Sequence, residues 1–501
     1  MDYILSIDAG TTSVRVLSID VESGQIVSIA QRPLPNYFPD PAKVEQDGAE
    51  IWNLLLECLK EISEKIDGKV LSIGITNQRE TVITWDIKTG RLLSRALVWQ
   101  DRRTTSMCTN LKDAGVESTV REKTGLVLDP YFSATKMKWI IDNLTESDLN
   151  NAVFGTVDTW ILWNLTGGLD NGTFATEPSN ASRTLLMDIN SISWSESLCD
   201  IFQVPMEKLP EIKPSCGSFG TVNGEVLSIW NSLKGVEVNA ILGDQQSALF
   251  GQCCFYPNMT KITYGTGSFL LSNVGASIPI AVDGLLTTIA WDLGRYASPG
   301  IAYALEGSIF SSGATVQWLR DSLCIINESK ELEPLALEAE TSQGVVLVPA
   351  FNGLGSPYWN QGARGAIFGI SKGVGRSHIA RAVLDSMIHQ TIDVIEKFEE
   401  SSNSKTTDIR VDGGASVMDT LLSEVATLSG STVKRPKSFE ATALGAARLS
   451  GLASGIYKDF EDINKLFEAE SVFYPNPTSQ TNTVSRDIWK RMVDKTLNFL
   501  D

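Results

Sequence analysis

Residues 3–20, which read YILSIDAGTTSVRVLSID, decide the fold. Two apolar runs, residues 3–7 and 14–19, flank the segment DAGTT (residues 8–12), whose small residues indicate a tight turn. The pattern predicts a strand, a turn of the size of a phosphate group, and a second strand. Glycine lets backbone N–H groups approach an anion closely, and a threonine hydroxyl adds a donor.

A similar unit lies half a chain away. Residues 261–273 read KITYGTGSFLLSN, so that an apolar strand leads into Tyr264-Gly-Thr-Gly267 and a second apolar strand follows. One such unit alone also describes an ordinary hairpin. The pair predicts an internally duplicated chain in which two facing turns hold one triphosphate.

A third element follows later in the chain. The apolar run at residues 409–411 precedes DGGA (residues 412–415), and Leu421, Leu422, Val425 and Leu428 then recur at helical spacing up to Gly430. Two glycines before a helix suit the close approach of a nucleotide. A tight turn between a strand and a helix, without a ligand, is the alternative.

Length, charge and absent motifs narrow the classes of function. A chain of 501 residues exceeds what a single core usually supports, which predicts two domains. The net charge of −18 opposes a nucleic-acid partner, whereas ATP can be held by backbone N–H groups and Mg²⁺. The sequence contains no G-x-x-x-x-G-K-[ST], G-x-G-x-x-G or H-E-x-x-H, which excludes P-loop NTPases, dinucleotide dehydrogenases and zincins.

Cysteines and histidines are interpreted as structural. The seven cysteines are scattered and never spaced as C-x-x-C, so we expect small buried side chains without disulfides or zinc. Both histidines, His378 and His389, adjoin an amphipathic helical pattern at residues 379–398. Because the start of the sequence lacks a basic leader and no apolar stretch is long enough for a membrane span, we expect a cytoplasmic protein.

The chain resembles the sugar and polyol kinases of the actin-like superfamily, the FGGY carbohydrate kinases. The resemblance runs from residue 4 to about residue 457 and includes GITNQRET (74–81), VWQ (98–100), DPYF (129–132), FGTVDTW (154–160), NASRT (180–184), GDQQ (243–246), YGTG (264–267), ARGAIFG (363–369) and TALG (442–445). It implies an α/β fold of two duplicated actin-like (ribonuclease H-like) domains around a central cleft. Residues 1–250 would carry most of the substrate site, and residues 251–501 most of the nucleotide site.

The tetrapeptide Asn77-Gln-Arg-Glu80 resembles that of the family members that phosphorylate glycerol. A pocket for glycerol needs charged or amide partners for three hydroxyls and an apolar wall for the CH edge. The resemblance places these substrate-binding residues at Arg79, Glu80, Trp99, Tyr131, Asp244, Gln245 and Phe269. Core packing is the alternative for Trp99 and Phe269, and a surface ion pair is the alternative for Arg79 and Glu80.

Phosphoryl transfer needs positioning, charge neutralisation and a carboxylate that accepts the proton of the attacking hydroxyl. By resemblance, Asp244 is the catalytic base, and Asp8 and Asp244 are the groups near Mg²⁺. The resemblance implies that ATP is bound by Thr11, Thr12, Ser13, Arg15, Thr266, Gly313, Gln317, Gly414 and Met418.

Three departures from the family pattern bear on regulation and nucleotide binding. Ala9 replaces a glutamine near the phosphates, so we expect looser coordination of the phosphates. Met418 and Asp419 replace asparagines, so we expect weaker recognition of adenine. Residues 221–238 lack the Gly-rich, Arg-containing loop with which some members bind fructose 1,6-bisphosphate. Expected partners are glycerol and ATP, and a homodimer or homotetramer is compatible with the resemblance. The alternatives are a kinase for another small polyol or ketose and an actin-like nucleotide-binding protein without kinase activity.

Overall fold

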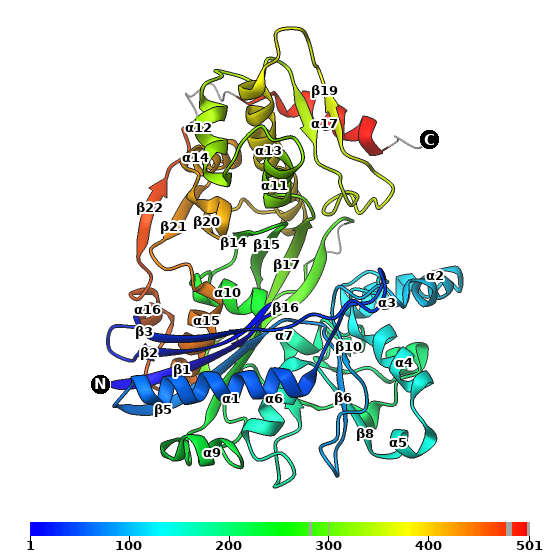
Figure 1. The fold of residues 1–501 in the computed structure, drawn as a ribbon, viewed down its shortest axis with the longest axis vertical. Helices are drawn as coiled ribbons and strands as arrows, with labels where there is room; N and C mark the ends of the chain where they lie inside the picture. Colours follow the sequence, from blue (N-terminus) through cyan, green and yellow to red (C-terminus); the bar gives the residue numbers. More distant parts are fainter. Residues whose placement is uncertain (280–282, 299, 477–482, 498–501) are drawn as a thin grey trace.

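The computed structural model describes residues 1–279, 283–298, 300–476 and 483–497, and is built on two mixed β-sheets (Figure 1). The N-terminal sheet has the strand order β13 (Val238–Gly243), β5 (Lys69–Asn77), β1 (Asp2–Ala9), β2 (Ser13–Asp20), β3 (Ile26–Pro33). The C-terminal sheet has the order β16 (Leu286–Asp292), β17 (Ile301–Ile309), β15 (Ser268–Gly275), β14 (Met259–Tyr264), β20 (Asp408–Asp412), β21 (Thr432–Pro436), β22 (Ala469–Phe473).

The two sheets repeat one topology. In the N-terminal sheet, β1 and β2 form an antiparallel hairpin, β3 extends it antiparallel to β2, and β5 and β13 add parallel strands beyond β1. In the C-terminal sheet, β14 and β15 form the hairpin, β17 takes the place of β3, and β20 and β21 take the places of β5 and β13. The predicted α/β duplication, with both turn-bearing hairpins, is therefore confirmed.

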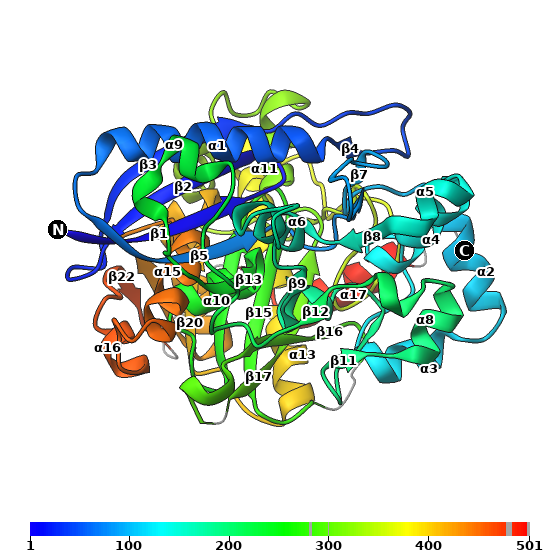
Figure 2. The ribbon, with the colours of Figure 1, turned by 90° about the horizontal axis from the view of Figure 1, so that it is seen from below.

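Helices cover both faces of the N-terminal sheet. Helix α1 (Gly48–Lys65) packs on β2 and β3, and its apolar residues join the N-terminal core, whereas α15 (Ala441–Ala453) packs on β1, β5 and β13 (Figure 2). Helix α15 thus belongs to the second half of the chain but covers the sheet of the first half. Its partner in the layer between the sheets is α10 (Asp244–Gly251), which follows β13 directly.

Glycine allows α10 and α15 to approach each other closely. A Cβ on Gly251 would lie 1.9 Å from the carbonyl oxygen of Ala441, and one on Gly445 would lie 1.8 Å from that of Ser247. The Ser247 hydroxyl in turn donates a hydrogen bond to the Thr442 carbonyl at 2.7 Å. Asp244, the first residue of α10, is therefore fixed relative to both halves of the chain.

Figure 1 shows five helices above the C-terminal sheet, namely α11 (Gly313–Asp321), α12 (Leu332–Leu337), α13 (Arg376–Ser402), α14 (Asp419–Ser429) and α17 (Arg486–Leu497), of which α13 and α14 pack on its strands. The helix predicted around residues 379–398 is α13. His389 is buried there and stacks on Trp489, with ring centroids 5.2 Å apart. His378 accepts a hydrogen bond from the Gly375 N–H at 3.0 Å, so both histidines have structural contacts, as predicted.

Between strands β5 and β13 of the N-terminal sheet the chain inserts a helical region, shown beside that sheet in Figure 1. Its elements are β6 (Ile83–Asp86), α2 (Thr105–Asp113), α3 (Glu117–Thr124), α4 (Ser133–Asn143), α5 (Glu146–Asn151), β8 (Ala152–Gly155), α6 (Val157–Leu165), α7 (Pro178–Ala181) and α8 (Glu196–Phe202). Trp85, Trp160 and Trp163 pack against one another where this region joins the N-terminal core.

Two local expectations need correction. The segment after β20 does not enter a helix at once, because a 3₁₀ turn at Gly414–Val417 precedes α14, which begins at Asp419. All seven cysteines are free, but Cys324 is exposed, so the prediction that all are buried is wrong there. None of the helices within the described ranges is long and apolar enough to cross a membrane.

Candidate active site

The carboxyl ends of three parallel strands bring the first group of predicted residues together. Strands β1, β5 and β13 run parallel, so their ends meet at one edge of the N-terminal sheet. Asp8 is the next-to-last residue of β1, Arg79 and Glu80 follow β5, and Asp244 follows β13. Sites at the carboxyl edge of a sheet are typical of α/β enzymes.

Arg79 is the centre of a buried polar cluster. Its Nη1 donates to Glu306 Oε2 at 2.7 Å and to Gln246 Oε1 at 3.2 Å, and its Nη2 donates to Glu306 Oε1 at 3.2 Å. Its Nε lies 3.4 Å from Asp244 Oδ1, whose side chain keeps 30% of its surface exposed, whereas Arg79 keeps only 2%. Arg79 is thus held rigidly beside a carboxylate that solvent and a substrate can reach.

A second arginine completes this cluster. Arg183 donates from Nε to Glu80 Oε1 at 2.7 Å and from Nη2 to Glu306 Oε1 at 3.0 Å. Glu80 has a left-handed backbone, with φ of 63°, and is almost fully buried. The ion pairs of Arg79 and Glu80 are therefore internal, and the surface alternative is excluded for both residues.

The charges of this cluster stabilise one another. Burial alone would raise the pKa of Glu306, but the guanidinium groups of Arg183 and Arg79 lower it to about 2. For Glu80, burial prevails over the attraction of the same two arginines and raises the pKa of its carboxyl group. Glu306 therefore keeps its negative charge at neutral pH and anchors both guanidinium groups.

An aromatic wall stands next to the cluster. Trp99 and Tyr131 pack edge to face, with centroids 5.4 Å apart, and the guanidinium of Arg183 lies 5.8 Å from the centre of the Tyr131 ring. The indole N–H of Trp99 donates to Thr11 Oγ1 at 2.9 Å. This hydrogen bond ties the predicted substrate wall to the first phosphate-sized turn.

The C-terminal sheet contributes one face to the same region. The strand register aligns Thr263 with Phe269 and Phe269 with Ser308, and aligns Lys261 with Leu271 and Leu271 with Glu306. Since side chains alternate along a strand, Lys261, Phe269 and Glu306 share one face of the sheet. Phe269 is half-buried there, beside the strand position that anchors Arg79.

Lys261 is a buried ammonium near the predicted base. Its Nζ donates to Gln245 Oε1 and, at 3.0 Å, to Thr263 Oγ1. Burial lowers the pKa of Lys261 to about 8, although the negative charges of Asp412 and Asp244 oppose that shift. The side chain of Gln245, which the sequence placed in the substrate site, is oriented by this lysine.

Arg15, just after the first turn, forms ion pairs with both Asp8 and Glu440. Arg15 donates to the Asp8 carboxylate through Nε, at 3.1 Å, and through Nη2, and its Nη1 donates to Glu440 Oε2 at 2.6 Å. Burial raises the pKa of Asp8 despite the pairing with Arg15, and the charge of Asp244 raises it further. Arg15, predicted to contact phosphates, is thus also the partner of the predicted metal-binding carboxylate.

The remaining predicted nucleotide residues gather at two turns of the C-terminal sheet. Ser312 and Gly313 donate backbone hydrogen bonds, both 3.0 Å long, to the carbonyl groups of Thr266 and Gly265. Gly413, with φ of 88°, packs so tightly on Tyr264 that a Cβ would lie 2.4 Å from its carbonyl oxygen, whereas a Cβ on Gly414 would meet open space. Open backbone remains at this second turn for a ligand.

Of the other predicted nucleotide residues, Gln317 is exposed on α11, Thr12 is exposed in the first turn, and Ser13 closes that turn by accepting from the Gly10 N–H at 2.9 Å. Met418 is 7% exposed and packs in the C-terminal core. Asp419 points outward and pairs with Arg435 at 2.8 Å. Weaker recognition of adenine through Met418 and Asp419 stays a prediction.

Four residues of the site were not predicted from the sequence. Arg183 and Gln246 lie within motifs that carried the resemblance, but no spacing assigned them a function. Glu306 is a lone acid in the apolar strand IAYALEGSI, and Lys261 begins KITYGTG. An acid or a lysine within a buried strand requires partners, and this was the available signal.

The comparisons with known proteins agree along the whole chain. The N-terminal domain model of the FGGY family of carbohydrate kinases matches residues 3–251, and the C-terminal domain model matches residues 260–454. The chain is 45% identical to the glycerol kinase of Pseudothermotoga lettingae, covering 100% of this chain and 99% of that protein. It is 44% identical to glycerol kinase 2 of Thermotoga maritima, with the same coverage.

Solved structures show the same similarity. The crystal structure of Plasmodium falciparum glycerol kinase with ADP superimposes with a TM-score of 0.92 at 34% identity, covering 99% of this chain and 98% of that one. The gluconate kinase of Lactobacillus acidophilus has a TM-score of 0.87 at 21% identity, covering 99% and 98%. At that identity the second similarity speaks for the fold alone.

Proposed function

The chain belongs to the FGGY family of carbohydrate kinases, and we infer that it is an ATP-dependent glycerol kinase whose general base is Asp244. It transfers the γ-phosphoryl group of ATP to glycerol, giving sn-glycerol 3-phosphate and ADP. The observation that carries the assignment of the base is the 3.4 Å approach of Arg79 Nε, held in a buried ion-pair cluster, to the partly exposed Asp244 Oδ1.

Asp244 has the surroundings that a base for an alcohol requires. Burial raises the pKa of its carboxyl group, while the positive charges of Arg79 and Lys261 oppose that shift. The carboxylate is partly exposed, so it can take the proton of the attacking hydroxyl as the bond to phosphorus forms. Arg79 fixes the carboxylate by its charge.

The polyol is recognised by groups that are already paired and oriented. Arg79 is held by Glu306 and Gln246, and Glu80 by Arg183, so they can bind a hydroxyl at little entropic cost. Gln245 is oriented in the same way by Lys261. Trp99, Tyr131 and Phe269 supply the apolar surface for the CH edge.

Asp8 and Asp244 are the groups that we assign to Mg²⁺. Mg²⁺ in kinases is held by one or two carboxylates, water and the substrate phosphates, so a cage of three protein ligands is not expected. Among the described residues no cluster of three or more candidate ligands is present, and the mutual repulsion of Asp8 and Asp244 fits a cation bound near both. When bound, Mg²⁺ neutralises charge on the phosphates.

We assign most of the glycerol site to residues 1–250 and most of the nucleotide site to residues 251–501. Glu306, Lys261 and Phe269 are contributions of the second half to the first site, and Thr11, Thr12, Ser13 and Arg15 are contributions of the first half to the phosphates. The turns at Thr266, Gly313 and Gly414 support the nucleotide assignment. A cytoplasmic location is supported by ATP as the phosphoryl donor and by the free cysteines.

The test is an assay of ADP release with Mg-ATP across glycerol, dihydroxyacetone, xylulose, ribulose and gluconate. We expect kcat/KM for glycerol to exceed that for the pentuloses and gluconate by at least about tenfold, because the wrong substrate leaves buried polar groups unpaired. Equal turnover of a pentulose or of gluconate would reassign the substrate. Binding of ATP without any ADP release would favour the nucleotide-binding alternative.

A further inference from the structure

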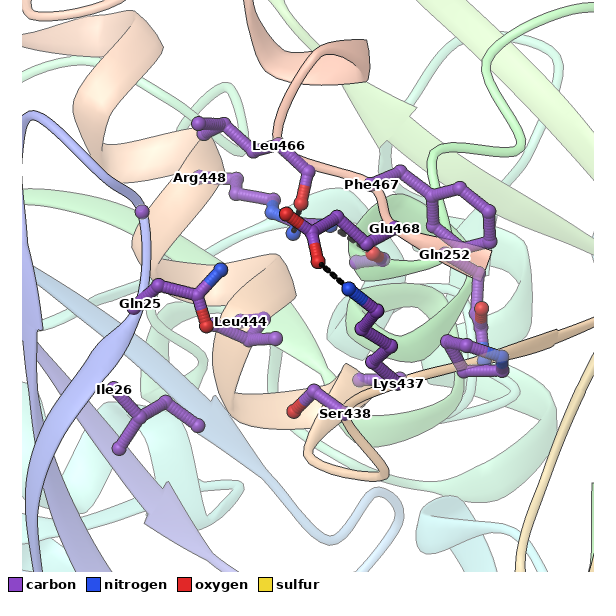
Figure 3. A pocket seen from close by; sticks show the side chains of 14 residues that line it. Gln25, Ile26, Gln252, Lys437, Ser438, Leu444, Arg448, Leu466, Phe467 and Glu468 are labelled. Atoms are coloured by element: carbon purple, nitrogen blue, oxygen red, sulfur yellow. Dashed lines mark hydrogen bonds and ion pairs between the residues drawn. The ribbon is translucent and has the colours of Figure 1, made fainter. Parts of the chain in front are cut away.

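A cavity outside the active site lies between the β2–β3 turn, the end of α10 and the segment that joins β21 to α15 (Figure 3). Its volume is about 160 Å³, below the roughly 300–1,000 Å³ that is common for larger organic ligands. Apolar and polar side chains both line it, the apolar ones being Ile26, Leu444 and Phe467 and the polar ones Gln25, Lys437, Ser438, Arg448 and Glu468 (Figure 3).

Arg448 gives this cavity a buried positive charge. The residue is 5% exposed, and its guanidinium donates to the carbonyl groups of Gly251 and, at 3.0 Å, Leu466. Its Nε has no hydrogen-bond partner. Within the described part of the chain, no carboxylate lies within 4.0 Å of its guanidinium nitrogens, in contrast to Arg15, Arg79 and Arg183.

A second cation stands at the rim of the cavity. Lys437 Nζ pairs with Glu468 Oε2 at 2.6 Å, and both side chains are more than half exposed, at 64% and 52%. An exposed pair of this kind contributes little to stability, so Lys437 can exchange its carboxylate partner for another anion while Glu468 turns to water. The Ser438 hydroxyl and the Gln25 amide add neutral donors.

Three walls of the cavity continue into the active site. Gly251 ends the helix that Asp244 begins. The segment that holds Lys437 and Ser438 also carries Glu440, the partner of Arg15, which in turn pairs with Asp8.

The third wall leads to the nucleotide turn. Gln252, which is 1% exposed, donates from Nε2 to Asp412 Oδ2 at 2.9 Å, and Asp412 directly precedes Gly413 and Gly414. A ligand in the cavity would therefore contact elements that hold Asp8, Asp244 and the Gly413–Gly414 turn.

We propose that this cavity is a regulatory site for a small phosphate-bearing anion, inorganic phosphate or a short phosphomonoester, held by Arg448, Lys437 and Ser438. The volume admits such an anion and excludes a nucleotide. Occupancy shifts the segment around Glu440 and so changes the affinity for Mg-ATP, and reciprocally the nucleotide changes the affinity for the anion. The cavity is separate from the turns that hold the ATP phosphates in the proposed function, and the ATP effect rests on that function.

The direct test is titration calorimetry with inorganic phosphate and, in a second series, with glycerol 3-phosphate, on protein saturated with glycerol and a non-hydrolysable Mg-ATP analogue. Saturation fills the active site, so that the remaining heat reports other sites. Ser438→Phe fills the cavity, Lys437→Met removes the cation at the rim, and Lys465→Met is the control, since Lys465 is an exposed lysine that pairs with Asp462 outside the cavity. Arg448→Met is informative only if the protein folds, because Arg448 also supports Gly251 and Leu466.

We expect binding in the wild type and in Lys465→Met, about tenfold weaker binding in Lys437→Met, and none in Ser438→Phe. The series with the stronger binding identifies whether the free ion or the ester is the natural form. Absence of binding in the wild type, or equal binding in Ser438→Phe, overturns the site.

Kinetics distinguish the site from the proposed function. In the wild type, phosphate should change KM for ATP at least twofold while KM for glycerol stays constant, and in Ser438→Phe this effect should vanish. Binding without any kinetic effect overturns the regulatory role. If the glycerol kinase assignment fails, the calorimetric result still stands, because nucleotide and anion binding need no turnover.

Discussion

Replacement of Glu306 by glutamine tests whether one buried carboxylate organises the substrate site. The change keeps the shape of the side chain but removes the charge that accepts two hydrogen bonds from Arg79, at 2.7 and 3.2 Å, and one from Arg183, at 3.0 Å. Two buried guanidinium groups then share Glu80 and the more exposed Asp244. Removing one partner of a buried ion pair costs about 3–5 kcal/mol, so Glu306→Gln should lower the free energy of unfolding by about that amount.

The effect on function should be visible beside the effect on stability. Arg79 loses its anchor, and a hydrogen bond to a charged group is worth about 1.5–3 kcal/mol, which corresponds to about a tenfold or greater rise in KM for glycerol. The assays are urea unfolding without ligands and steady-state kinetics below the unfolding range. Asp393→Asn is the control, because Asp393 is also buried and paired with an arginine, Arg486 at 2.5 Å. It also accepts a hydrogen bond from Trp489, and neither partner belongs to the Arg79 cluster.

The control should lose stability and keep its KM for glycerol. The reasoning is refuted if Glu306→Gln unfolds within about 1 kcal/mol of the wild type, or if its KM for glycerol changes less than twofold. Either result would mean that Glu80 and Asp244 alone suffice to hold the two arginines.

Three further predictions address single residues. Arg79→Ala should raise KM for glycerol more than it lowers kcat, because it removes a group that holds hydroxyls and leaves Glu80 with Arg183 alone; steady-state kinetics decide, and an unchanged KM would contradict it. Lys261→Met should release Gln245 and raise KM for glycerol several-fold, whereas Lys434→Met, which removes a lysine paired with Asp408 elsewhere in the same sheet, should not. Burial lowers the pKa of His389 to about 3, so between about pH 6.5 and 3 only the unfolded chain binds this proton. The free energy of unfolding therefore falls with falling pH, by up to about 1.4 kcal/mol per pH unit. His389→Asn should flatten that slope in acid unfolding, and an equal effect of His378→Asn would exclude His389 as its origin.

Secondary-structure elements that depend only on short-range sequence patterns could be predicted from the sequence. The hairpins β1–β2 and β14–β15, the strand β20 and the helix α13 were all predicted, because each follows from apolar periodicity and glycine turns within a single segment. The 3₁₀ turn at Gly414–Val417 was not predicted, because it depends on the close packing of Gly413 against Tyr264, about 150 residues earlier in the sequence.

The site was predictable only where motifs carried it. Asp8, Arg79, Glu80 and Asp244 stand at strand ends, and the parallel arrangement of β1, β5 and β13 brings them together. Glu306 gains its importance from the register that aligns β17 with β15 and turns its side chain toward Arg79. The contact of Glu306 with Arg79 also depends on how the two halves of the chain pack, which a local pattern does not contain.

The most direct test of the central claim is kcat of the Asp244→Asn enzyme at saturating glycerol and Mg-ATP, with the fold checked by circular dichroism. Asparagine keeps the shape of the side chain but removes its charge and basicity, and loss of a general base costs about 10²- to 10⁴-fold. We predict a fall of kcat in that range, with a much smaller change in glycerol binding. A variant that retains more than about a tenth of the wild-type kcat would contradict the assignment of Asp244 as the base.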